Sequence, residues 1–351
     1  MNLRTWTTHI LLGLAALRGA GCATAAPDVG PHPAWPGPPA SPRIVHRLDL
    51  RQSSDLMRPS FLDALGNLVF GEQPLRLIRP NCAALNADNL LAVTDQELQA
   101  VVLFNLRNGR TLLADKAGPT GNDHFVSPVG VAACPEGFIV ADSALNKVVL
   151  LNTQGEYQRD IIPPKTLARP TGLAYDASRR ELYVVDTLAH EILVYDLQGQ
   201  RRRRFGGPGR EPGQFNFPTH ICVDPAGKVY VTDSMNYRVQ VFTPEGRYLL
   251  EFGKQGDATG YLAVPKGVGV DRAGHIYVVD SYTTNVQVFD ATGQFLLSFG
   301  SPGSARGEFL VPSGLCLSPD NRIFVCDGMN HRLQVFQYVG EPANATHPST
   351  P

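Results

Sequence analysis

Short apolar segments recur along most of this chain, and each is bounded by Gly, Asp or Asn. The two most similar stretches, residues 219–252 and 266–299, share one order of elements. Both contain an apolar strand, an Asp, a Gly turn, Tyr-Val-x-Asp-Ser, an Asn, Val-Gln-Val-Phe, a second Gly turn and a strand ending in Phe-Gly. Alternating or continuous runs of Val, Ile, Tyr and Phe between turn residues predict short β-strands, four in each unit.

Three landmarks mark six copies of this unit. Each copy opens on a proline, reaches an aspartate about fifteen residues later, and has a large apolar residue nine positions after that aspartate. The prolines are Pro80, Pro128, Pro170, Pro218, Pro265 and Pro312; the aspartates are Asp95, Asp142, Asp186, Asp233, Asp280 and Asp327; the apolar residues are Phe104, Leu151, Tyr195, Phe242, Phe289 and Phe336. A repeat of this length with four strands is typical of a propeller blade, which cannot bury its two apolar faces alone. The sequence therefore predicts an all-β, six-bladed β-propeller over residues 43–338.

The ends of the repeat array predict how the ring closes. The sixth unit stops after its third strand, at Tyr338, whereas residues 44–50 form a strand-like segment that belongs to no unit. We expect this N-terminal strand to complete the last blade. Residues 60–71 break the pattern and, with Ser60 as a cap, predict a short helical insertion. Residues 339–351 are expected to be a disordered tail.

The first 42 residues have the features of a secretory leader and a spacer. Arg4, an apolar run and Gly19-Ala20-Gly21 precede Cys22, which resembles the bacterial lipobox. We therefore expect residues 1–21 to be a lipoprotein signal peptide and Cys22 to carry lipid; ordinary cleavage is the alternative. Seven prolines between residues 27 and 42 predict a spacer, residues 22–42, that forms neither helix nor sheet. The expected location is the cell envelope, at the outer membrane facing the periplasm in a bacterium with two membranes.

Composition narrows the possible partners. The net charge is -1, so the chain lacks the basic excess of a nucleic-acid-binding protein. Its six cysteines form no C-x-x-C pair, which argues against zinc fingers and thioredoxin-like redox motifs, and we expect mostly free, buried thiols. The single basic run, residues 201–204, falls on the predicted outermost strand of the third blade. There it protects a sheet edge or contacts an anionic lipid or glycan.

The motif that begins at Asp233, Asp-Ser-Met-Asn-Tyr-Arg-Val-Gln-Val-Phe, resembles an NHL repeat, as do the segments from Asp280 and Asp327. With the leader and the proline spacer, the chain is similar to bacterial NHL-repeat six-bladed propeller lipoproteins. This resemblance implies the fold and leaves the function open. Because an aspartate recurs in every blade, we interpret it as a structural hydrogen-bond acceptor and not as a metal ligand. We expect the asparagines and arginines that follow it to bridge blades: Asn236, Asn285, Asn330, Arg238 and Arg332.

The opening prolines and the Asp-Ser turns should lie on one face of the ring, which we call the Pro-side face. The residues directly after the prolines should ring the mouth of the channel there: Asn81, Val129, Thr171, Thr219, Lys266 and Ser313. One position later, most blades have glycine and the fourth has His220. We predict a ligand site formed by His220, Lys266, Asn81, Thr219 and Ser313. The alternative is a solvated pore with hydrophilic walls.

Two kinds of propeller enzyme resemble this chain and offer an alternative to a binding role. In the peptidylglycine amidating lyase, zinc-binding histidines follow the repeat proline in several blades, and here none of those six positions is histidine. Lactonase-like and streptogramin-lyase-like propellers use Glu, Asp, Asn or His around a divalent metal, and this sequence has no concentrated acidic set. We therefore predict no catalytic residue, metal or cofactor. The predicted function is a lipid-anchored binding or scaffolding module, with a protein, peptide or glycan partner on the Pro-side face and no nucleic acid partner; a metal-dependent propeller enzyme remains the alternative.

Overall fold

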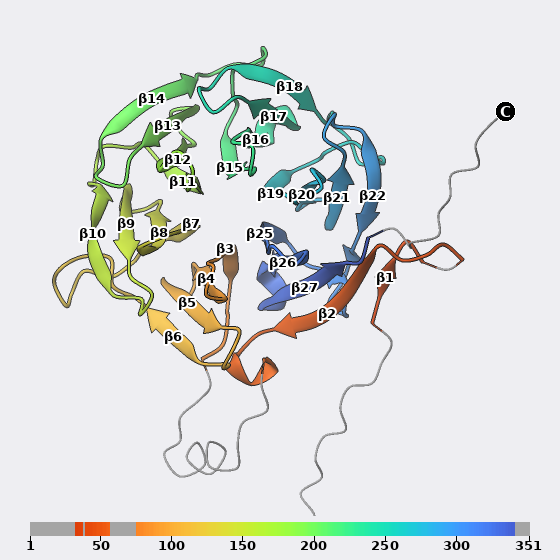
Figure 1. Ribbon diagram of the computed structural model, residues 1–351, viewed down its shortest axis with the longest axis horizontal. Coiled ribbons are helices and arrows are strands. Elements are labelled where there is room, and N and C mark those ends of the chain that lie inside the picture. Colours follow the sequence, from red (N-terminus) through yellow and green to blue (C-terminus); the bar gives the residue numbers. More distant parts are fainter. Residues whose placement is uncertain (1–31, 38, 57–74, 341–351) are drawn as a thin grey trace, which may run out of the picture. The chain divides into compact units, whose positions relative to one another are not determined.

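Six antiparallel sheets are arranged around a common axis, as predicted (Figure 1). The computed structural model describes residues 32–37, 39–56 and 75–340. Within this part of the chain the only helices are three short 3-10 turns, η1 (Ser53–Asp55), η2 (Ser234–Asn236) and η3 (Gly328–Asn330). The all-β, six-bladed propeller is confirmed.

Each blade has four main strands that follow one another outward from the axis. Blades one to three are β3 (Pro80–Leu85), β4 (Leu90–Asp95), β5 (Ala100–Asn105), β6 (Thr111–Ala114); β7 (Pro128–Cys134), β8 (Gly137–Asp142), β9 (Lys147–Leu151), β10 (Tyr157–Ile162); and β11 (Pro170–Asp176), β12 (Glu181–Asp186), β13 (Glu191–Tyr195), β14 (Arg201–Gly206). Blades four to six are β15 (Pro218–Val223), β16 (Val229–Asp233), β17 (Arg238–Phe242), β18 (Tyr248–Phe252); β19 (Pro265–Val270), β20 (Ile276–Asp280), β21 (Asn285–Phe289), β22 (Phe295–Phe299); and β25 (Pro312–Leu317), β26 (Arg322–Asp327), β27 (Arg332–Tyr338), β2 (Ile44–Leu50) with β1 (Ala34–Trp35) at its edge. A small parallel pair, β23 (Ser301–Pro302) and β24 (Glu308–Phe309), links blades five and six.

The landmark proline and aspartate face each other across the two innermost strands of every blade. Each proline is the first residue of its strand, a position that tolerates a missing N–H, and it pairs in register with the aspartate that ends the next strand. In blade one, Asp95 Oδ2 accepts the backbone N–H groups of Ile78 and Arg79 at 2.7 and 2.9 Å, and its Oδ1 accepts those of Glu97 and Leu98. One carboxylate therefore joins the loop before the first strand to the turn after the second, which confirms the structural interpretation of the aspartates.

The hydrophobic core consists of six clusters, one between each pair of neighbouring blades. The apolar landmark residues, nine positions after each aspartate, are all buried. Since both faces of each sheet are apolar, a blade is covered only when it has a neighbour on each side. This requirement holds for the sixth blade as well, so the ring has to close.

A belt of side-chain hydroxyls ties each blade to the next on the Pro-side face. In four consecutive blades, the Ser or Thr after the landmark aspartate donates to the carbonyl of the proline that opens the following blade. The pairs are Ser143 with Pro170 at 2.6 Å, Thr187 with Pro218 at 2.7 Å, Ser234 with Pro265 at 2.8 Å, and Ser281 with Pro312. Between blades six and one the equivalent residue is Gly328, and Ser313 donates instead to Asn81 O at 2.8 Å. The belt was not predicted from the repeat.

The strand β2 closes the ring by pairing with β27, and both Val45 and Leu48 are in register with that strand. Its Ile44 belongs to the cluster between blades five and six, and its Leu50 to the cluster between blades six and one. The predicted closure by an N-terminal strand is confirmed.

The expectation that the proline-rich spacer forms no sheet is wrong at Ala34–Trp35, which pairs with β2. The Trp35 ring explains this pairing, because its centroid lies 5.8 Å from the rings of both Phe299 and Phe336. An aromatic side chain that buries on these two rings holds its proline-flanked strand against the blade. The start of the propeller therefore lies within the predicted spacer.

Arg332 joins three parts of the closed blade. Its guanidinium contacts Asp327 Oδ2 at 2.8 Å and Asp49 Oδ2 of β2 at 2.9 Å, and it donates to the carbonyls of Ala305 and Glu308 in the preceding loop. Arg238 binds its own connecting loop in the same way.

The expected bridging between blades therefore takes a different form. Arg238, Arg332, Asn236 and Asn330 hold the connecting loops, whereas Asn285 only accepts a hydrogen bond from Thr283. The buried glutamines of Val-Gln-Val-Phe, which the sequence analysis did not single out, hold the same loops through Gln240, Gln287 and Gln334.

Other predictions concern the surface and the ends of the chain. The basic run lies on the outermost strand β14, where Arg202, Arg203 and Arg204 pair with carboxylates of their own blade. All five cysteines in the described part are free, as predicted.

No helix within residues 32–37, 39–56 and 75–340 has the length and apolar character to cross a membrane. The predicted signal peptide, Cys22, the helical insertion at 60–71 and residues 341–351 lie outside the described residues.

Replacing Arg332 tests the importance of the closing blade. We expect Arg332→Gln to lower the free energy of unfolding by roughly 3–5 kcal/mol, because it removes one partner of a buried ion pair and leaves the fully buried Asp327 without its guanidinium. Arg322→Gln is the matched control, since Arg322 pairs with the exposed Asp320 and should change stability by less than about 1 kcal/mol. Denaturant titration of both variants measures the difference, and equal, small losses would contradict this role of Arg332.

Candidate functional site

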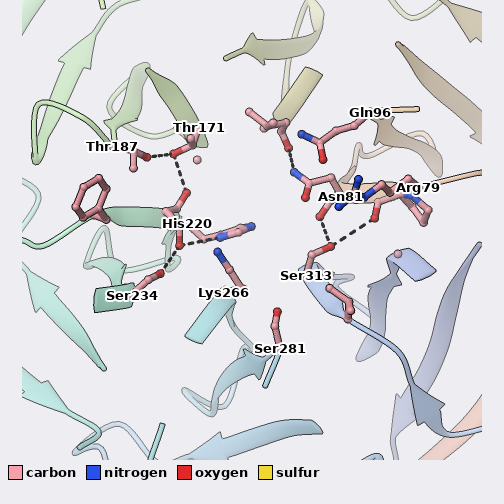
Figure 2. Close-up of a pocket in the computed structure, with 18 of the residues that line it drawn as sticks. Arg79, Asn81, Gln96, Thr171, Thr187, His220, Ser234, Lys266, Ser281 and Ser313 are labelled. Atoms are coloured by element: carbon pink, nitrogen blue, oxygen red, sulfur yellow. Dashed lines mark hydrogen bonds between the residues drawn. The ribbon is translucent and has the colours of Figure 1, made fainter. Parts of the chain in front are cut away.

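The Pro-side mouth of the central channel is a pocket of about 380 Å³. All six blades contribute to its lining through the residue that follows each opening proline. The five residues predicted as ligand-binding, Asn81, Thr219, His220, Lys266 and Ser313, all line this pocket. Figure 2 shows Asn81, His220, Lys266 and Ser313 around one central space. The structure thus brings the predicted set together, while their role in binding stays a prediction.

An irregularity in every innermost strand turns these side chains toward the axis. In each blade the regular pairing shifts directly after the opening proline. Such bulges redirect a side chain and increase the local twist. The blades also crowd one another here: a Cβ on Gly130 or Gly314 would lie within 3 Å of a backbone oxygen of the next blade.

His220 occupies a position that is glycine in four of the six blades. Its Nδ1 lies 3.2 Å from Thr219 Oγ1, and its backbone N–H donates to Thr232 Oγ1. Burial, with a smaller contribution from the charge of Lys266, lowers the pKa of His220 to about 3. The imidazole is therefore neutral at physiological pH and acts in the pocket as a hydrogen-bonding group.

Lys266 points into the pocket beside His220 (Figure 2). Burial and, secondarily, the charge of Arg169 lower the pKa of its ammonium group. Among the described residues, no carboxylate forms an ion pair with Lys266 and no side chain accepts a hydrogen bond from it. An ammonium group that is largely desolvated and unpaired favours the approach of an anion.

Two arginines complete the cationic set, and the sequence analysis missed both. Arg79 and Arg169 directly precede the opening prolines of blades one and three, and both line the pocket. Neither guanidinium has a carboxylate partner in the described part of the chain. The signal was available, because residues on either side of the proline reach the same face. The pocket lining thus holds three basic side chains and no Asp or Glu.

The hydroxyl groups around the pocket are already committed to the ring. Thr187, Ser234 and Ser281 donate to proline carbonyls of the following blades, and Thr171 and Ser313 bond to backbone oxygens across blade boundaries. The polar groups left for a ligand are therefore mainly the nitrogen donors of Arg79, Arg169, Lys266 and His220.

Below the pocket most side chains along the channel wall are apolar. Val131, Leu173, Val268 and Leu315 line this deeper part, together with Cys82, Cys222 and Cys316. Burial raises the pKa of all three thiols, so they are uncharged.

Two sequence families match the chain. The family described as SMP-30/Gluconolactonase/LRE-like region matches residues 69–254, which is more than half of the chain. The NHL repeat family matches residues 309–336. This range covers β25, β26 and most of β27, which are the three inner strands of blade six.

Solved propellers share the fold at low sequence identity. A structural genomics protein of unknown function from Bacteroides thetaiotaomicron aligns with a TM-score of 0.59 and 14% identity, over 74% of this chain and 70% of its own. A streptogramin B lyase aligns with a TM-score of 0.56 and 13% identity, over 74% of this chain and 94% of its own. Virginiamycin B lyase from Staphylococcus aureus aligns with a TM-score of 0.55 and 14% identity, over 76% and 98%. At these identities the likeness concerns the fold.

The pocket does not fit the divalent metal of lactonase-like and lyase-like propellers. Hard divalent cations prefer carboxylate and carbonyl oxygens, and this lining has no carboxylate. In the described residues, no group of three or more His, Cys, Asp or Glu side chains is placed to hold a metal ion. The positive charges of Arg79, Arg169 and protonated Lys266 would repel a metal ion at the same place.

The unpaired charge of Lys266 predicts a measurable cost to the free protein. We expect Lys266→Met, which keeps the aliphatic stem, to raise the free energy of unfolding at pH 7, whereas Lys254→Met in an exposed loop should leave it unchanged. The pKa of Lys266 is lowered in the folded state, so the unfolded chain binds more protons as the pH rises through that lowered pKa. Over this pH range the free energy of unfolding of the wild type therefore rises relative to that of Lys266→Met. Thermal unfolding between pH 7 and pH 10 measures both effects; a destabilised Lys266→Met would contradict them.

Proposed function

The chain belongs to the SMP-30/gluconolactonase/LRE-like family, and we propose that it uses this propeller as a binding module for an anionic ligand. The ligand site is the Pro-side pocket, and its preferred group is a carboxylate. The observation that carries the proposal is the lining itself, with Arg79, Arg169 and Lys266 and no acidic side chain.

Electrostatic attraction between the basic side chains of the pocket and an anionic ligand is strong enough to favour binding. Two unit charges about 4 Å apart interact by about 4 kcal/mol at an effective dielectric constant near 20. Because Lys266 is already desolvated in the free protein, a bound carboxylate gains this attraction without a further large desolvation cost on the lysine side. Arg169 and Arg79 are exposed and can rotate onto the anion, where a guanidinium binds a carboxylate through two parallel hydrogen bonds.

The neutral His220 adds specificity to the site. Its unprotonated form offers one donor and one acceptor, and Thr219 engages Nδ1. The Nε2 atom is the one left for a ligand. A hydrogen bond there orients the ligand without adding charge.

Direct binding measurements test the proposal. Succinate, citrate and inorganic phosphate serve as probes in calorimetric titrations. We expect at least one of the carboxylates to bind the wild-type protein, Lys266→Met and Arg169→Gln to weaken that binding at least tenfold, and Lys254→Met to leave it unchanged. Binding that is absent for all three probes, or unaffected in Lys266→Met, would contradict the site.

The pH profile of the same binding distinguishes Lys266 from His220. After correction for the ionisation of the probe itself, affinity should stay level between pH 5.5 and 8, since His220 is neutral across that range. It should fall at alkaline pH as Lys266 loses its proton, earlier than an ordinary lysine would. A gain in affinity on acidification from pH 8 to 5.5 would instead indicate a protonated His220.

We extend the proposal to location, on the strength of the leader alone. Cys22 carries the lipid anchor, and the chain is held in the cell envelope, at the outer membrane facing the periplasm in a bacterium with two membranes. Labelling with a palmitate analogue should mark the wild-type protein and should not mark Cys22→Ser, which should also leave the membrane fraction. Equal labelling of both proteins would contradict lipidation at Cys22.

A further inference from the structure

Five large apolar side chains form an exposed arc on one side of the pocket. They are Phe217, Met235, Tyr282, Val311 and Met329, which we call the apolar arc. Their exposed fractions are 39%, 47%, 71%, 47% and 47%. Four of them line the pocket directly, and Tyr282 follows the lining residue Ser281. The arc therefore borders the cationic site and is continuous with it.

The arc arises from two repeat positions that carry other residues elsewhere in the ring. Phe217 and Val311 directly precede the opening prolines of blades four and six, where blades one and three have Arg79 and Arg169. The Met and Tyr residues stand two positions after the landmark aspartates of blades four to six. In blade three the same position holds another exposed apolar residue, Leu188, and guanidinium groups precede the opening prolines in blades one and three.

The backbone at two of these residues is held in an unfavourable conformation. Phe217 and Val311 have φ values of 52° and 57°, in the left-handed region that bulky and β-branched residues avoid. For Phe217, the backbone N–H donates to His190 Nδ1 at 3.1 Å and the two rings lie 4.7 Å apart. Residues held this way typically cost about 1–3 kcal/mol each and cluster at binding sites. Here the strain keeps large apolar side chains at the rim of the pocket.

We infer that the apolar arc and the cationic pocket together bind the C-terminal end of a partner protein, with apolar residues on the arc and the terminal carboxylate among Arg79, Arg169 and Lys266. This inference rests on the proposed function, because it needs an anion site at the centre of the face. Aromatic residues and Met on the arc match the composition of protein-binding surfaces.

The shape of the ring favours a chain end over a chain that passes across. The pocket lies at the channel mouth and is walled by all six blades, so a ligand that enters from the Pro-side face is surrounded by the cationic side chains. A carboxyl terminus brings the negative charge that this lining lacks, whereas an amino terminus would add a fourth cation. At about 3.3 Å per extended residue, the last three or four residues of a peptide reach from the pocket across the arc.

Peptide binding tests the inference. The probes are N-acetylated hexapeptides that end in two residues chosen from Leu, Val, Phe and Met, each prepared as the free acid and as the C-terminal amide. We expect the free acids to bind wild-type protein and the amides to bind at least tenfold more weakly. The double variant Met235→Ser/Met329→Ser should lose at least tenfold in peptide affinity. Tyr282→Ser, which changes the arc residue outside the pocket lining, should weaken peptide binding and keep the affinity for succinate or citrate. Leu249→Ser, which removes an equally exposed apolar residue from the outer strand β18, is the matched control and should change neither.

The outcomes separate this inference from the function on which it rests. If small carboxylates bind through Lys266 while acid and amide peptides bind equally or not at all, the peptide inference is overturned and the anion site stands. If dodecanoate binds more tightly than every peptide and depends on Met235 and Met329, the occupant is an acyl amphiphile and the inference is likewise overturned. If neither small carboxylates nor peptides depend on Lys266, both proposals fail.

Discussion

Every blade of this propeller has two apolar faces, and the fold depends on covering all of them. Five blades are complete within the repeat array, and the sixth receives its outer strand from residues 44–50. Ile44 and Leu50 place that strand in the clusters on both sides of the last blade, and Arg332 ties it to Asp49 by an almost fully buried ion pair. Without this pairing two blade interfaces would lose part of their cover. The central pocket exists only because the ring is closed.

Closure also explains how chemistry is concentrated at one place. The repeat puts six equivalent positions around the axis, so any blade that departs from the common residue does so at the pocket. His220 replaces a glycine, Lys266 replaces a small or neutral residue, and Arg79 and Arg169 stand where other blades have Ser, Val or Phe. The landmark aspartates hold the backbone in all blades and the hydroxyl belt holds it in four of them, so the residues that vary between blades distinguish this pocket. A rigid ring of this kind offers a preorganised site, so less ordering cost accompanies binding.

Much of this arrangement was accessible from the sequence, since periodic landmarks report backbone geometry directly. Proline marked the first residue of each inner strand because it lacks an N–H, and the aspartate marked the register partner. The spacing after Asp233 identified a buried Phe242. The same logic placed Asn81, Lys266 and Ser313 at the channel mouth.

What the sequence analysis missed depends on contacts between distant segments. Trp35 forms a strand because its ring reaches Phe299 and Phe336, a contact that no local proline count predicts. Arg79 and Arg169 were overlooked because only the residues after each proline were considered. The hydroxyl belt needed the relative placement of neighbouring blades. The apolar arc was not recognised because an apolar residue before a proline looks like core until its exposure is known.

The chain belongs to a family that includes lactonases, whereas the charge of its pocket favours an anion. These two findings point to different uses of one fold. A divalent metal at the axis needs acidic oxygens, and each of the three cations here would oppose it by several kcal/mol at short range. The landmark aspartates supply no substitute, since backbone N–H groups already engage their carboxylates. An anion is attracted by the charges that would repel a metal. It pairs with Lys266, whose charge is otherwise unpaired, and it meets guanidinium groups that have no other partner in the described chain. The ring holds equivalent positions from six blades around one axis, and the cationic residues at three of these positions, Arg79, Arg169 and Lys266, are the basis of the anion site that we propose.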